Sequence, residues 1–516
     1  MFDKWKSYFQ SNQADLKDPA PPAPSTPIPA SLEDTLVYLY GQFGKSSDLT
    51  IRHLTVCGHQ LAAVSFEGMV DRHMMADAVI LPITALQGTY TPEQLLKHIR
   101  DEVLGFADML QVATMEELML LLTSGFAAIL IDGVPAAVLG GLQNFMIRGV
   151  GEPSTEVTVR GSRESFTEAI RVNVSMIRRR MKTPELIFEM MSAGKTSNTA
   201  VCLCYMKGRV SDRLLSDVRS RIATLPLDVV LESGYIQPFL EGTSHSLFTS
   251  VDSTERPDTL CGKIIEGRIG VLVDGTPFAL IVPYLFVEHF QSMDDYALHP
   301  YYASFLRIIK YVAFFVSLLL PGLYVAVGTH HPEMFPPALL LSFLKSNQAT
   351  PFPLTVEALM IHFLFEIMRE AGLRFPKAVG HAVSIVGALV IGESAVNAGL
   401  IGAPMVIIVA LTALSSFVLP SLYGPIAILR FGFIILGGAL GLYGVMIGVV
   451  LLTCSICAMH IQSIPFTAPI TPFSFRAMKD VFIRADWRKL WKQHFLVQNV
   501  RGSNIRTDVS EQDPPQ

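Results

Sequence analysis

The sequence predicts an α/β soluble N-terminal part with two similar lobes, followed by an α-helical polytopic membrane domain. Three features of the chain indicate this fold class. Residues Phe305 to Met459 are apolar almost throughout, the charged residues gather on either side of that stretch, and an Asp-Gly hairpin pattern occurs twice before it. Charged residues make up 16% of the 516 residues, below the share of about 25% that is usual for soluble domains.

The first 33 residues are polar and rich in proline, a composition that does not form a packed core, so we expect a disordered tail. They show no pattern of a secretory signal, and we therefore expect the soluble part to stay in the cytoplasm. The net charge of −5 gives no overall basic field for nucleic acid. The six cysteines do not have the arrangement of a secreted disulfide framework.

The first lobe is predicted to span residues 34–146. Apolar residues at helical spacing indicate helices, and alternating apolar and polar residues indicate strands. The Asp132-Gly133 dipeptide between two apolar runs is a strong signal for a β-hairpin. The expected helices are Leu32–Phe43, Val70–Leu81 and Thr114–Leu122, and the expected strands are Leu49–Val56, Gln60–Phe66, Gly125–Ile131 and Val134–Leu139.

The second lobe, residues 147–300, is predicted to be a copy of the first. Asp132-Gly133 recurs as Asp274-Gly275, 142 residues further along the chain, and a glycine precedes both dipeptides at the same spacing. Gly68, which lies between a strand pattern and a helix pattern, has its counterpart in Gly208 at nearly the same offset. Two matches at nearly one offset favour duplication over a chance recurrence of hairpins.

A charged helix is expected between the lobes, over Arg163–Met181, where apolar residues recur at helical spacing. Arginines gather near its C-terminal end, where the helix dipole favours positive charge. Because arginine pairs well with carboxylates, we expect them to stabilise the soluble domain or its contacts between subunits; a solvated face is the alternative. The arginines are Arg160, Arg163, Arg178, Arg179 and Arg180, and the nearby carboxylates are Glu152, Glu156, Glu164 and Glu168.

The transmembrane domain is predicted over residues 301–463, and a basic cytoplasmic tail with a disordered end over 464–516. A helix needs about 20 apolar residues to cross a bilayer. Basic residues cluster at Arg307 and Lys310, at Arg369–Lys377 and at Lys479–Lys492. Because lysine and arginine mark cytoplasmic loops, we expect all three clusters and both termini on that side. The four expected crossings are about 311–328, 354–370, 398–419 and 431–459, with 380–397 re-entrant or broken; six crossings are the alternative.

Polar residues inside this domain are candidate functional residues, because a charge in a bilayer is costly. One group of intramembrane polar residues is Glu357, His362, Glu366 and Arg430. A second group lies in the stretch 387–399, which is rich in small residues. Small residues allow close helix contact or line a cavity. This stretch therefore either lines a pore or packs, for example with Glu393 against Arg430. Its candidate pore-lining residues are Glu393, Ser394, Val396 and Asn397.

Other motifs give no sign of catalysis or of a cofactor. Gly194-Lys195-Thr196 ends like a phosphate-binding loop, but the position that needs the upstream glycine is Glu189. Cys454 and Cys457 have redox spacing but lie in an apolar helix, where packing or lipid contact is the ordinary role of sulfur. His330-His331 has no partner at metal-ligand spacing. We therefore expect a protein that is not an enzyme and that holds no metal.

Several ordered stretches carry a resemblance to a known family. In the soluble part they are Gly151-Glu152-Pro153, residues 156–166, Asn173, residues 177–180, Glu255-Arg256-Pro257-Asp258 and residues 267–277 with Pro283. In the membrane part they are residues 369–376 and 391–396. Together they span about 34–490 and resemble the GerA family of spore germination proteins, specifically the A-type subunits of nutrient germinant receptors. Ser162 and Glu255 depart from the proline and aspartate that are usual in the family.

The resemblance implies a multi-pass protein of the spore inner membrane that contacts membrane lipid. It implies assembly with a transporter-like B-type subunit and a lipoprotein C-type subunit. It also implies a homo-oligomeric ring around a nutrient-gated pore for monovalent cations, whose opening triggers germination. An F-type relative that is associated with SpoVA shares the fold and the motifs and is the alternative. A structural membrane scaffold is a further alternative, whereas a secondary transporter is disfavoured because no inverted repeat is visible.

Overall fold

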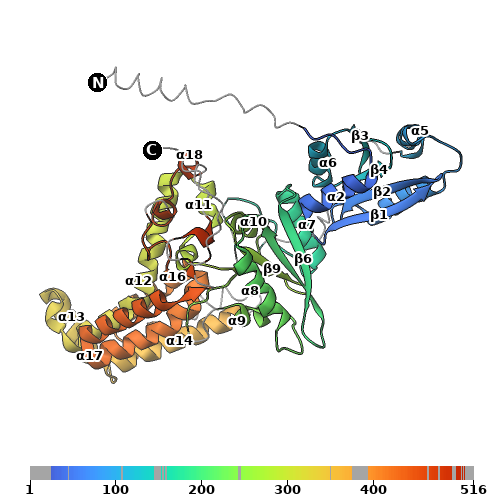
Figure 1. The fold of residues 1–516 in the computed structure, drawn as a ribbon. Helices are drawn as coiled ribbons and strands as arrows, with labels where there is room; N and C mark the ends of the chain where they lie inside the picture. Colours follow the sequence, from blue (N-terminus) through green and yellow to red (C-terminus); the bar gives the residue numbers. More distant parts are fainter. Residues whose placement is uncertain are drawn as a thin grey trace, which may run out of the picture. The chain divides into compact units, whose positions relative to one another are not determined.

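The computed structural model describes residues 25–44, 46–105, 108–143, 153, 156, 158, 160–241, 246–348, 350–374, 393–461, 464–474, 477–490, 496–500, 503 and 505. The chain forms two compact units. The first consists of Met1–Gly149 with Arg171–Glu189, and the second consists of Val150–Ile170 with Met190–Gln516. The first contains one α/β lobe, and the second contains most of another lobe and the helical region (Figure 1).

The first lobe contains a five-stranded antiparallel sheet with strand order β1-β2-β4-β5-β3. Residues of β2 alternate between two hydrophobic cores, so that Leu61 and Ala63 face one layer of helices and Ala62 and Val64 face the other. The sheet is therefore the middle of three layers. Its elements are α2 (Leu32–Phe43), β1 (Leu49–Val56), β2 (His59–Phe66), α3 (Arg72–Met74), η1 (Met75–Ile80), α4 (Leu81–Thr84), α5 (Pro92–His98), η2 (Ile99–Val103), β3 (Met109–Val112), α6 (Met115–Leu122), β4 (Phe126–Ile131) and β5 (Ala137–Gly141).

The second lobe repeats this topology with strand order β6-β7-β9-β10-β8. In each sheet the strands, counted along the chain, lie in the order first, second, fourth, fifth, third. The fourth and fifth strands form the hairpin that contains the Asp-Gly turn, β4 with β5 in one sheet and β9 with β10 in the other. The elements are α7 (Ile170–Arg180), β6 (Leu186–Ala193), β7 (Thr199–Met206), α8 (Asp212–Ala223), η3 (Ser233–Tyr235), α9 (Gln237–Leu240), β8 (Asp252–Thr254), α10 (Pro257–Ile265), β9 (Ile269–Val273) and β10 (Ala279–Val282).

The two Asp-Gly turns make the same hydrogen bonds in both lobes. The Asp132 carboxylate accepts from the backbone N–H of Leu32 at 3.0 Å, and the Asp274 carboxylate accepts from that of Ile170 at 3.1 Å. Leu32 and Ile170 are the first residues of α2 and α7, so each turn satisfies a free amide at a helix N-terminus. Both turn glycines have positive φ, 88° at Gly133 and 91° at Gly275, which only glycine adopts readily. The predicted duplication is confirmed.

Several predicted elements agree with the structure, and others differ from it. Leu32–Phe43 and Leu49–Val56 have the predicted bounds. The helix predicted over Arg163–Met181 begins only at Ile170, because the preceding chain is held by the residue that follows β8: Phe166 N–H and the Ser165 hydroxyl both donate to the Glu255 carbonyl. The edge strands β3 and β8 were not predicted.

The helical region begins after η4 (Phe286–Phe290). Among the described residues, two helices, Pro300–His330 and Pro420–Ala458, are long and apolar enough to cross a membrane, and Ala403–Phe417 is a shorter apolar helix. The elements are α11 (Met293–Ala297), α12 (Pro300–His330), η5 (Pro332–Met334), α13 (Pro337–Gln348), α14 (Leu354–Arg374), α16 (Ala403–Phe417), η6 (Pro420–Leu422), α17 (Tyr423–Ala458), β11 (His460–Ile461), β12 (Ile464–Pro465), η7 (Ala477–Asp480), α18 (Trp487–Leu490) and η8 (Val497–Asn499).

The helix α17 reverses direction in its middle, at Gly441. This residue has φ 63° and ψ −146°, which no helix contains. A side chain at Gly448 would meet the Phe433 ring at 2.7 Å, although 15 residues of straight helix would separate them by about 22 Å. The stretch predicted as a single segment over 431–459 is thus part of two antiparallel helices.

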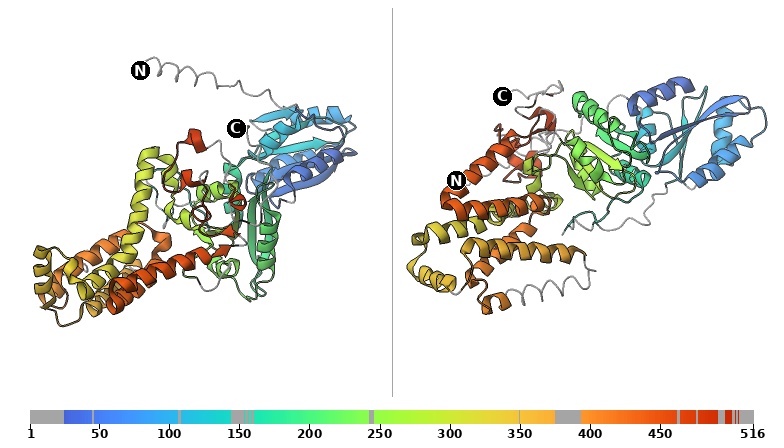
Figure 2. Two further views of the ribbon diagram at one scale, coloured as in Figure 1. Left: turned by 60° about the vertical axis from the view of Figure 1, so that its left-hand side comes forward. Right: turned by 90° about the horizontal axis from the view of Figure 1, so that it is seen from below.

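The helices run between two ends of one bundle. We call the end next to lobe 2 the proximal end and the end at His330 the distal end. Gly322 lies against Phe433 and His330 lies against Gly441, so α12 and the first half of α17 run in parallel. Gly328 lies against Leu354, so α14 starts at the distal end. Figure 2 shows this bundle from two further directions.

The duplicated turns give a testable prediction. Asp132→Ala and Asp274→Ala each remove the acceptor at one helix N-terminus, which costs about 1 kcal/mol. We expect amide hydrogen exchange to become roughly five-fold faster in the peptide containing Leu32 for the first variant and Ile170 for the second. Asp212→Ala, in the exposed first turn of α8, is the matched control. Equal exchange at Ile170 in Asp274→Ala and the control would contradict the equivalence of the two turns.

Candidate functional site

The short helix η4 joins lobe 2 to the bundle. Phe286 and Phe290 pack edge-on against the Phe314 ring of α12, with ring centroids 6.0 and 5.6 Å apart. The Nδ1 atom of His289 lies 3.2 Å from the Ser421 hydroxyl in η6. One element of lobe 2 therefore touches both the first long helix and the connection that precedes α17.

Glu288 fixes η4 within lobe 2. Its buried carboxylate receives the Arg268 guanidinium at 2.6 Å, the Lys263 ammonium, and the backbone N–H of Leu285 at 2.7 Å. Burial alone would raise the pKa of Glu288, but the charges of Arg268 and Lys263 outweigh it and hold this pKa below its ordinary value. Glu288 therefore stays ionised, and η4 cannot leave its place without separating a buried carboxylate from two cations.

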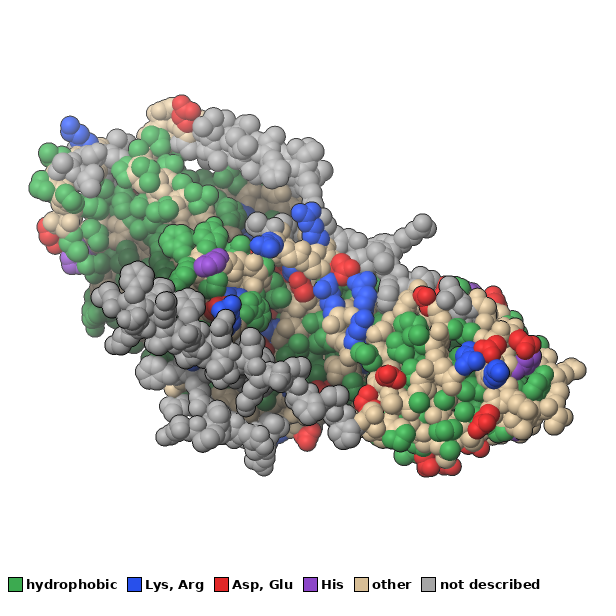
Figure 3. All heavy atoms as spheres, turned by 90° about the horizontal axis from the view of Figure 1, so that it is seen from above, with side chains coloured by type: hydrophobic (Ala, Val, Ile, Leu, Met, Phe, Trp, Pro, Cys, Tyr) green, Lys and Arg blue, Asp and Glu red, His purple; other side chains and the backbone are tan. Residues whose placement is uncertain are grey.

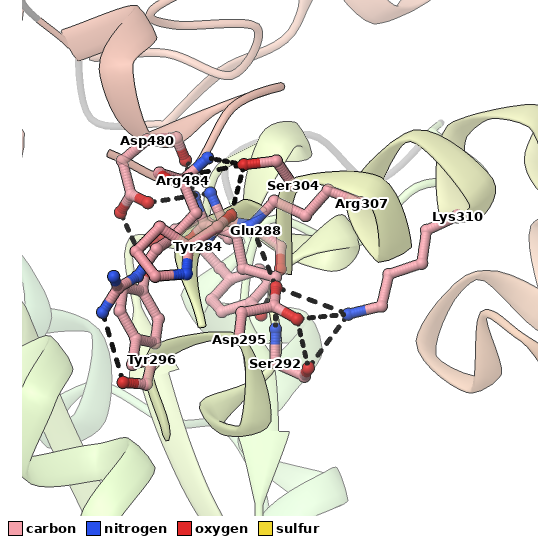
Figure 4. A network of polar contacts seen from close by, with 12 residues as sticks. Tyr284, Glu288, Ser292, Asp295, Tyr296, Ser304, Arg307, Lys310, Asp480 and Arg484 are labelled. Atoms are coloured by element: carbon pink, nitrogen blue, oxygen red, sulfur yellow. Dashed lines mark hydrogen bonds and ion pairs between the residues drawn. The ribbon is translucent and has the colours of Figure 1, made fainter. Parts of the chain in front are cut away.

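A second polar cluster surrounds Arg307 near the start of α12 (Figure 4). The fully buried guanidinium donates to Asp295 at 2.9 Å and to the carboxylate of Asp480 at 2.7 Å. The Tyr296 hydroxyl donates to the other oxygen of Asp480 at 2.7 Å. Burial and the neighbouring Asp480 charge raise the pKa of Tyr296 well above its ordinary value, so it remains a hydrogen-bond donor.

The same cluster fastens the C-terminal segment to the start of α12. Arg484 donates to the Tyr296 carbonyl at 3.2 Å, and its backbone N–H donates to the Ser304 hydroxyl at 3.0 Å. Lys310 lies 3.3 Å from Asp295. The tail segment around Asp480 and Arg484 is thus packed against α11 and α12, and its basic residue Arg484 is buried.

The intramembrane candidates fall into separate places. Glu357 is buried and accepts from the backbone N–H of Gly402 at 2.7 Å, so it satisfies the N-terminus of α16 at the distal end. His362 is also buried, with its Nδ1 atom 2.9 Å from the Ala358 carbonyl. Sequence spacing had indicated that Glu357 and Glu366 do not share a helix face, and the structure gives them different partners.

Glu366 and Arg430 lie together and connect four helices. Glu366 accepts from the Tyr423 hydroxyl at 2.8 Å and lies 3.5 Å from Nη1 of Arg430. Arg430 also donates to the Ser317 carbonyl at 3.2 Å and the Ser416 hydroxyl at 2.9 Å. Arg430 is therefore the partner of Glu366, whereas the sequence had offered it as a packing partner of Glu393.

The candidate pore-lining residues form one short helical turn, with a hydrogen bond from Ala398 N–H to the Ser394 carbonyl at 2.9 Å. Glu393, Ser394 and Asn397 are exposed, and Val396 is half-buried. Within the described residues, the side chains of Glu393 and Asn397 make no polar contact. Most of the stretch predicted as re-entrant, residues 380–392, lies outside the described residues.

The candidate arginines of the soluble part include one that is fully buried. Arg178 forms two hydrogen bonds with the Asp48 carboxylate, at 2.8 and 3.1 Å, and lies over the rings of Phe66 and Phe188. The pairing of Arg178 with Asp48 was not predicted, because only glutamates close to Arg178 in the sequence were considered. Asp48 lies 130 residues away. The others are more open: Arg160 and Arg163 are exposed, and Arg179 and Arg180 are half-buried.

Comparisons with known proteins identify the family of this chain. The family described as "Bacillus/Clostridium GerA spore germination protein" matches residues 37–495. The chain belongs to the GerA family. It is 39% identical to spore germination protein KA of Bacillus subtilis, over 89% of this chain and 85% of that protein. It is 32% identical to spore germination protein GerLA of Bacillus cereus, over 89% of this chain and 94% of that protein.

This GerA-family chain is also similar to a second Bacillus subtilis protein and to a solved domain. It is 35% identical to the uncharacterized membrane protein YfkQ of Bacillus subtilis, over 89% of this chain and 90% of that protein. It is also similar to the crystal structure of the N-terminal domain of the A subunit of the Bacillus megaterium spore germinant receptor GerK3. That match has 29% sequence identity and a TM-score of 0.40, and it covers 51% of this chain and 99% of the other.

The Arg307 cluster gives a second prediction. Arg307→Gln leaves the buried Asp295 carboxylate without its main cation, and breaking a buried ion pair in this way costs about 3–5 kcal/mol. We expect a large drop in the unfolding temperature of the full chain in detergent. The control is Arg374→Gln, which breaks an exposed pair with Glu370 and costs about 0–1 kcal/mol. A similar unfolding temperature for both variants would show that the cluster is not a structural joint.

Proposed function

We propose that this GerA-family chain is the A-type subunit of a nutrient germinant receptor and that its bundle spans a membrane. The proposal rests first on family membership, since the chain matches relatives named spore germination proteins along most of its length. One relative is named a membrane protein. We infer partners from the family resemblance: B-type and C-type receptor subunits, membrane lipid and monovalent cations.

The observation that carries membrane insertion is the surface of the bundle. Large apolar side chains face outward on its helices, among them Ile407 and Leu414 on α16 and Tyr443 on α17, with exposed fractions of 68%, 67% and 62%. Figure 3 shows hydrophobic side chains covering much of this part of the described surface. Contiguous apolar surface of this kind is unusual on a soluble protein and is expected where helices face lipid.

The ends of the helices support six passes with lobe 2 on the cytoplasmic side. The chain leaves lobe 2 through α12 and returns beside it at Met459, whose sulfur lies 2.8 Å from the Ser246 hydroxyl. Each half of α17 has about 18 residues, or about 27 Å of helix, close to the thickness of the hydrocarbon core. The described helices α12, α14, α16 and the two halves of α17 would supply five of these passes, and we propose the sixth for the chain between Arg374 and Glu393, which lies outside the described residues.

The charges support the same orientation. Arg307 and Lys310 lie at the proximal end with Asp295, and Arg369 lies there with Glu366 and Tyr423. The tail residue Arg484 lies beside them at Ser304. Members of all three basic clusters therefore lie at one end, as expected for the cytoplasmic side.

We place the pore at the exposed turn that contains Glu393, Ser394, Val396 and Asn397. Within the described residues Glu393 and Asn397 make no polar contact, and such groups are costly in lipid, so we propose that they face water or another subunit. A homo-oligomeric ring in which these turns face the axis would provide both. An apolar ring at Val396 would close the pore by dewetting, and Glu393 would attract cations at its mouth. The scaffold alternative leaves these polar groups without a role.

Lobe 2 would act on the pore through η4. This helix is held in the lobe by Glu288 and contacts the bundle through Phe286, Phe290 and His289. A displacement of lobe 2 would therefore reach α12 and the α16–α17 connection together. Such a joint suits a subunit that converts an event in its soluble part into a rearrangement of helices.

The proposed orientation can be tested by labelling. In intact cells that express the full chain, a membrane-impermeant thiol reagent should label Glu333→Cys at the distal end, because that end faces the exterior. Lys479→Cys, at the proximal end, should be labelled only after permeabilisation, and the parent chain with its six cysteines provides the background. Equal labelling of both variants from outside would refute this orientation.

The proposed pore can be tested by flux. Val396→Ser should hydrate the constriction, so that reconstituted protein leaks monovalent cations and spores leave dormancy without nutrient. Glu393→Gln should reduce cation selectivity while assembly is retained. Val406→Ser, a half-buried valine of α16, is the control for a general loss of packing. If Val396→Ser behaves like this control while the protein is present at its normal level, the turn that contains Val396 packs against other helices and does not line a pore.

A further inference from the structure

One edge of lobe 2 exposes large apolar side chains between α8 and β8. Leu231, Tyr235, Phe239 and Leu247 have exposed fractions of 63%, 43%, 36% and 44%. We call these four residues the apolar edge. Their neighbours Val230, Ile236 and Leu240 point into the lobe and are fully buried. The exposed set is therefore the outward face of a folded segment.

The backbone of this segment is held in place on both sides. The Thr199 hydroxyl donates to the Val230 carbonyl at 2.6 Å, and Arg221 donates to the Phe239 carbonyl at 3.3 Å. The Gln237 side chain donates to the Val251 carbonyl at 3.2 Å, which ties α9 to the start of β8. Because these bonds fix the backbone, the apolar edge cannot turn inward to escape water.

The apolar edge continues into the proximal end of the bundle. Leu247 lies between Ser246, which bonds Met459, and Phe248, which is buried in one cluster with Phe314, Leu419 and Met459. Met459 directly follows the last residue of α17. Figure 1 also shows α9 at the end of lobe 2 next to the bundle. The apolar edge thus lies where the surface of a membrane would meet the lobe.

We propose that the apolar edge inserts into the boundary between headgroups and acyl chains of the leaflet on the side of lobe 2. The inference rests on the proposed membrane insertion of the bundle. Tyrosine and other aromatic side chains favour this boundary, because an apolar ring can enter lipid while its polar part stays hydrated. A bundle in a bilayer brings this lipid surface to Leu247 without any further molecule, which favours lipid over a partner protein as the occupant.

The charges near the edge specify how it binds. Asp228 and Glu232 flank Leu231 in the sequence and are exposed, so the described residues beside Leu231 carry negative charge, which does not attract anionic headgroups. Apolar burial supplies the attraction. The contact should therefore be nearly insensitive to salt, unlike a polybasic membrane contact.

Tryptophan fluorescence of the full chain in lipid bilayers tests the proposal. Phe239→Trp places the probe on the apolar edge, and the signal of the parent chain, which has three tryptophans, is subtracted. We expect lipids brominated near the headgroup to quench this probe about two-fold or more, at low and high salt. Ile265→Trp is the matched control, because Ile265 is 42% exposed at the end of α10, away from α9 in Figure 1.

A third variant separates this inference from membrane insertion itself. Ile407→Trp, on the outward face of α16, should be quenched by lipids brominated deep in the acyl chains. If Ile407→Trp is quenched but Phe239→Trp is quenched no more than Ile265→Trp, the apolar edge does not meet lipid and only this inference fails. If Ile407→Trp is not quenched, membrane insertion and the inference fail together. Quenching of Phe239→Trp that disappears when the other receptor subunits are added would assign the edge to a protein partner and overturn the proposal.

Discussion

Arg307 joins the start of α12 to the short helix before it and to the C-terminal segment, which is far away in the sequence. Its guanidinium lies between Asp295, just before α12, and Asp480, in the C-terminal segment. Breaking a buried ion pair of this kind is costly, because alternative arrangements leave a charge unpaired in an apolar setting. The start of α12 and the chain after α17 are thereby placed at one end of the bundle. The helical region therefore begins and ends at the same end of the bundle.

Within the bundle, glycine takes the role that larger apolar side chains have in the lobes. A Cβ atom at Gly322 would lie 2.7 Å from the Phe433 carbonyl oxygen, so α12 and α17 approach each other at the level of the backbone. Close packing of this kind is the main attraction between helices in lipid. Lipid tails are as apolar as the side chains, so burying a side chain against another helix gives no hydrophobic gain. In the lobes, by contrast, β2 is buried on both faces by aliphatic side chains.

The duplication shows how far local patterns reach. The Asp-Gly dipeptides indicate a hairpin in each lobe because glycine readily adopts the positive φ that a tight turn between strands needs. Nothing in that pattern indicates that Asp132 and Asp274 also serve helices about 100 residues earlier. The short edge strands β3 and β8 were missed for a related reason, since three or four residues carry too little alternation to stand out.

The sequence by itself determined the family, the two α/β lobes, the apolar bundle and the bounds of strongly periodic elements such as α2 and β1. These properties depend on residues within a few positions of one another or on total apolar content. Only the tertiary structure decided that Arg178 pairs with Asp48, that Arg430 pairs with Glu366, and that α17 turns back at Gly441. Ion pairs join residues that are distant in the sequence, so no local pattern indicates them. An apolar run with a glycine has the same hydropathy whether the helix continues through the glycine or reverses there.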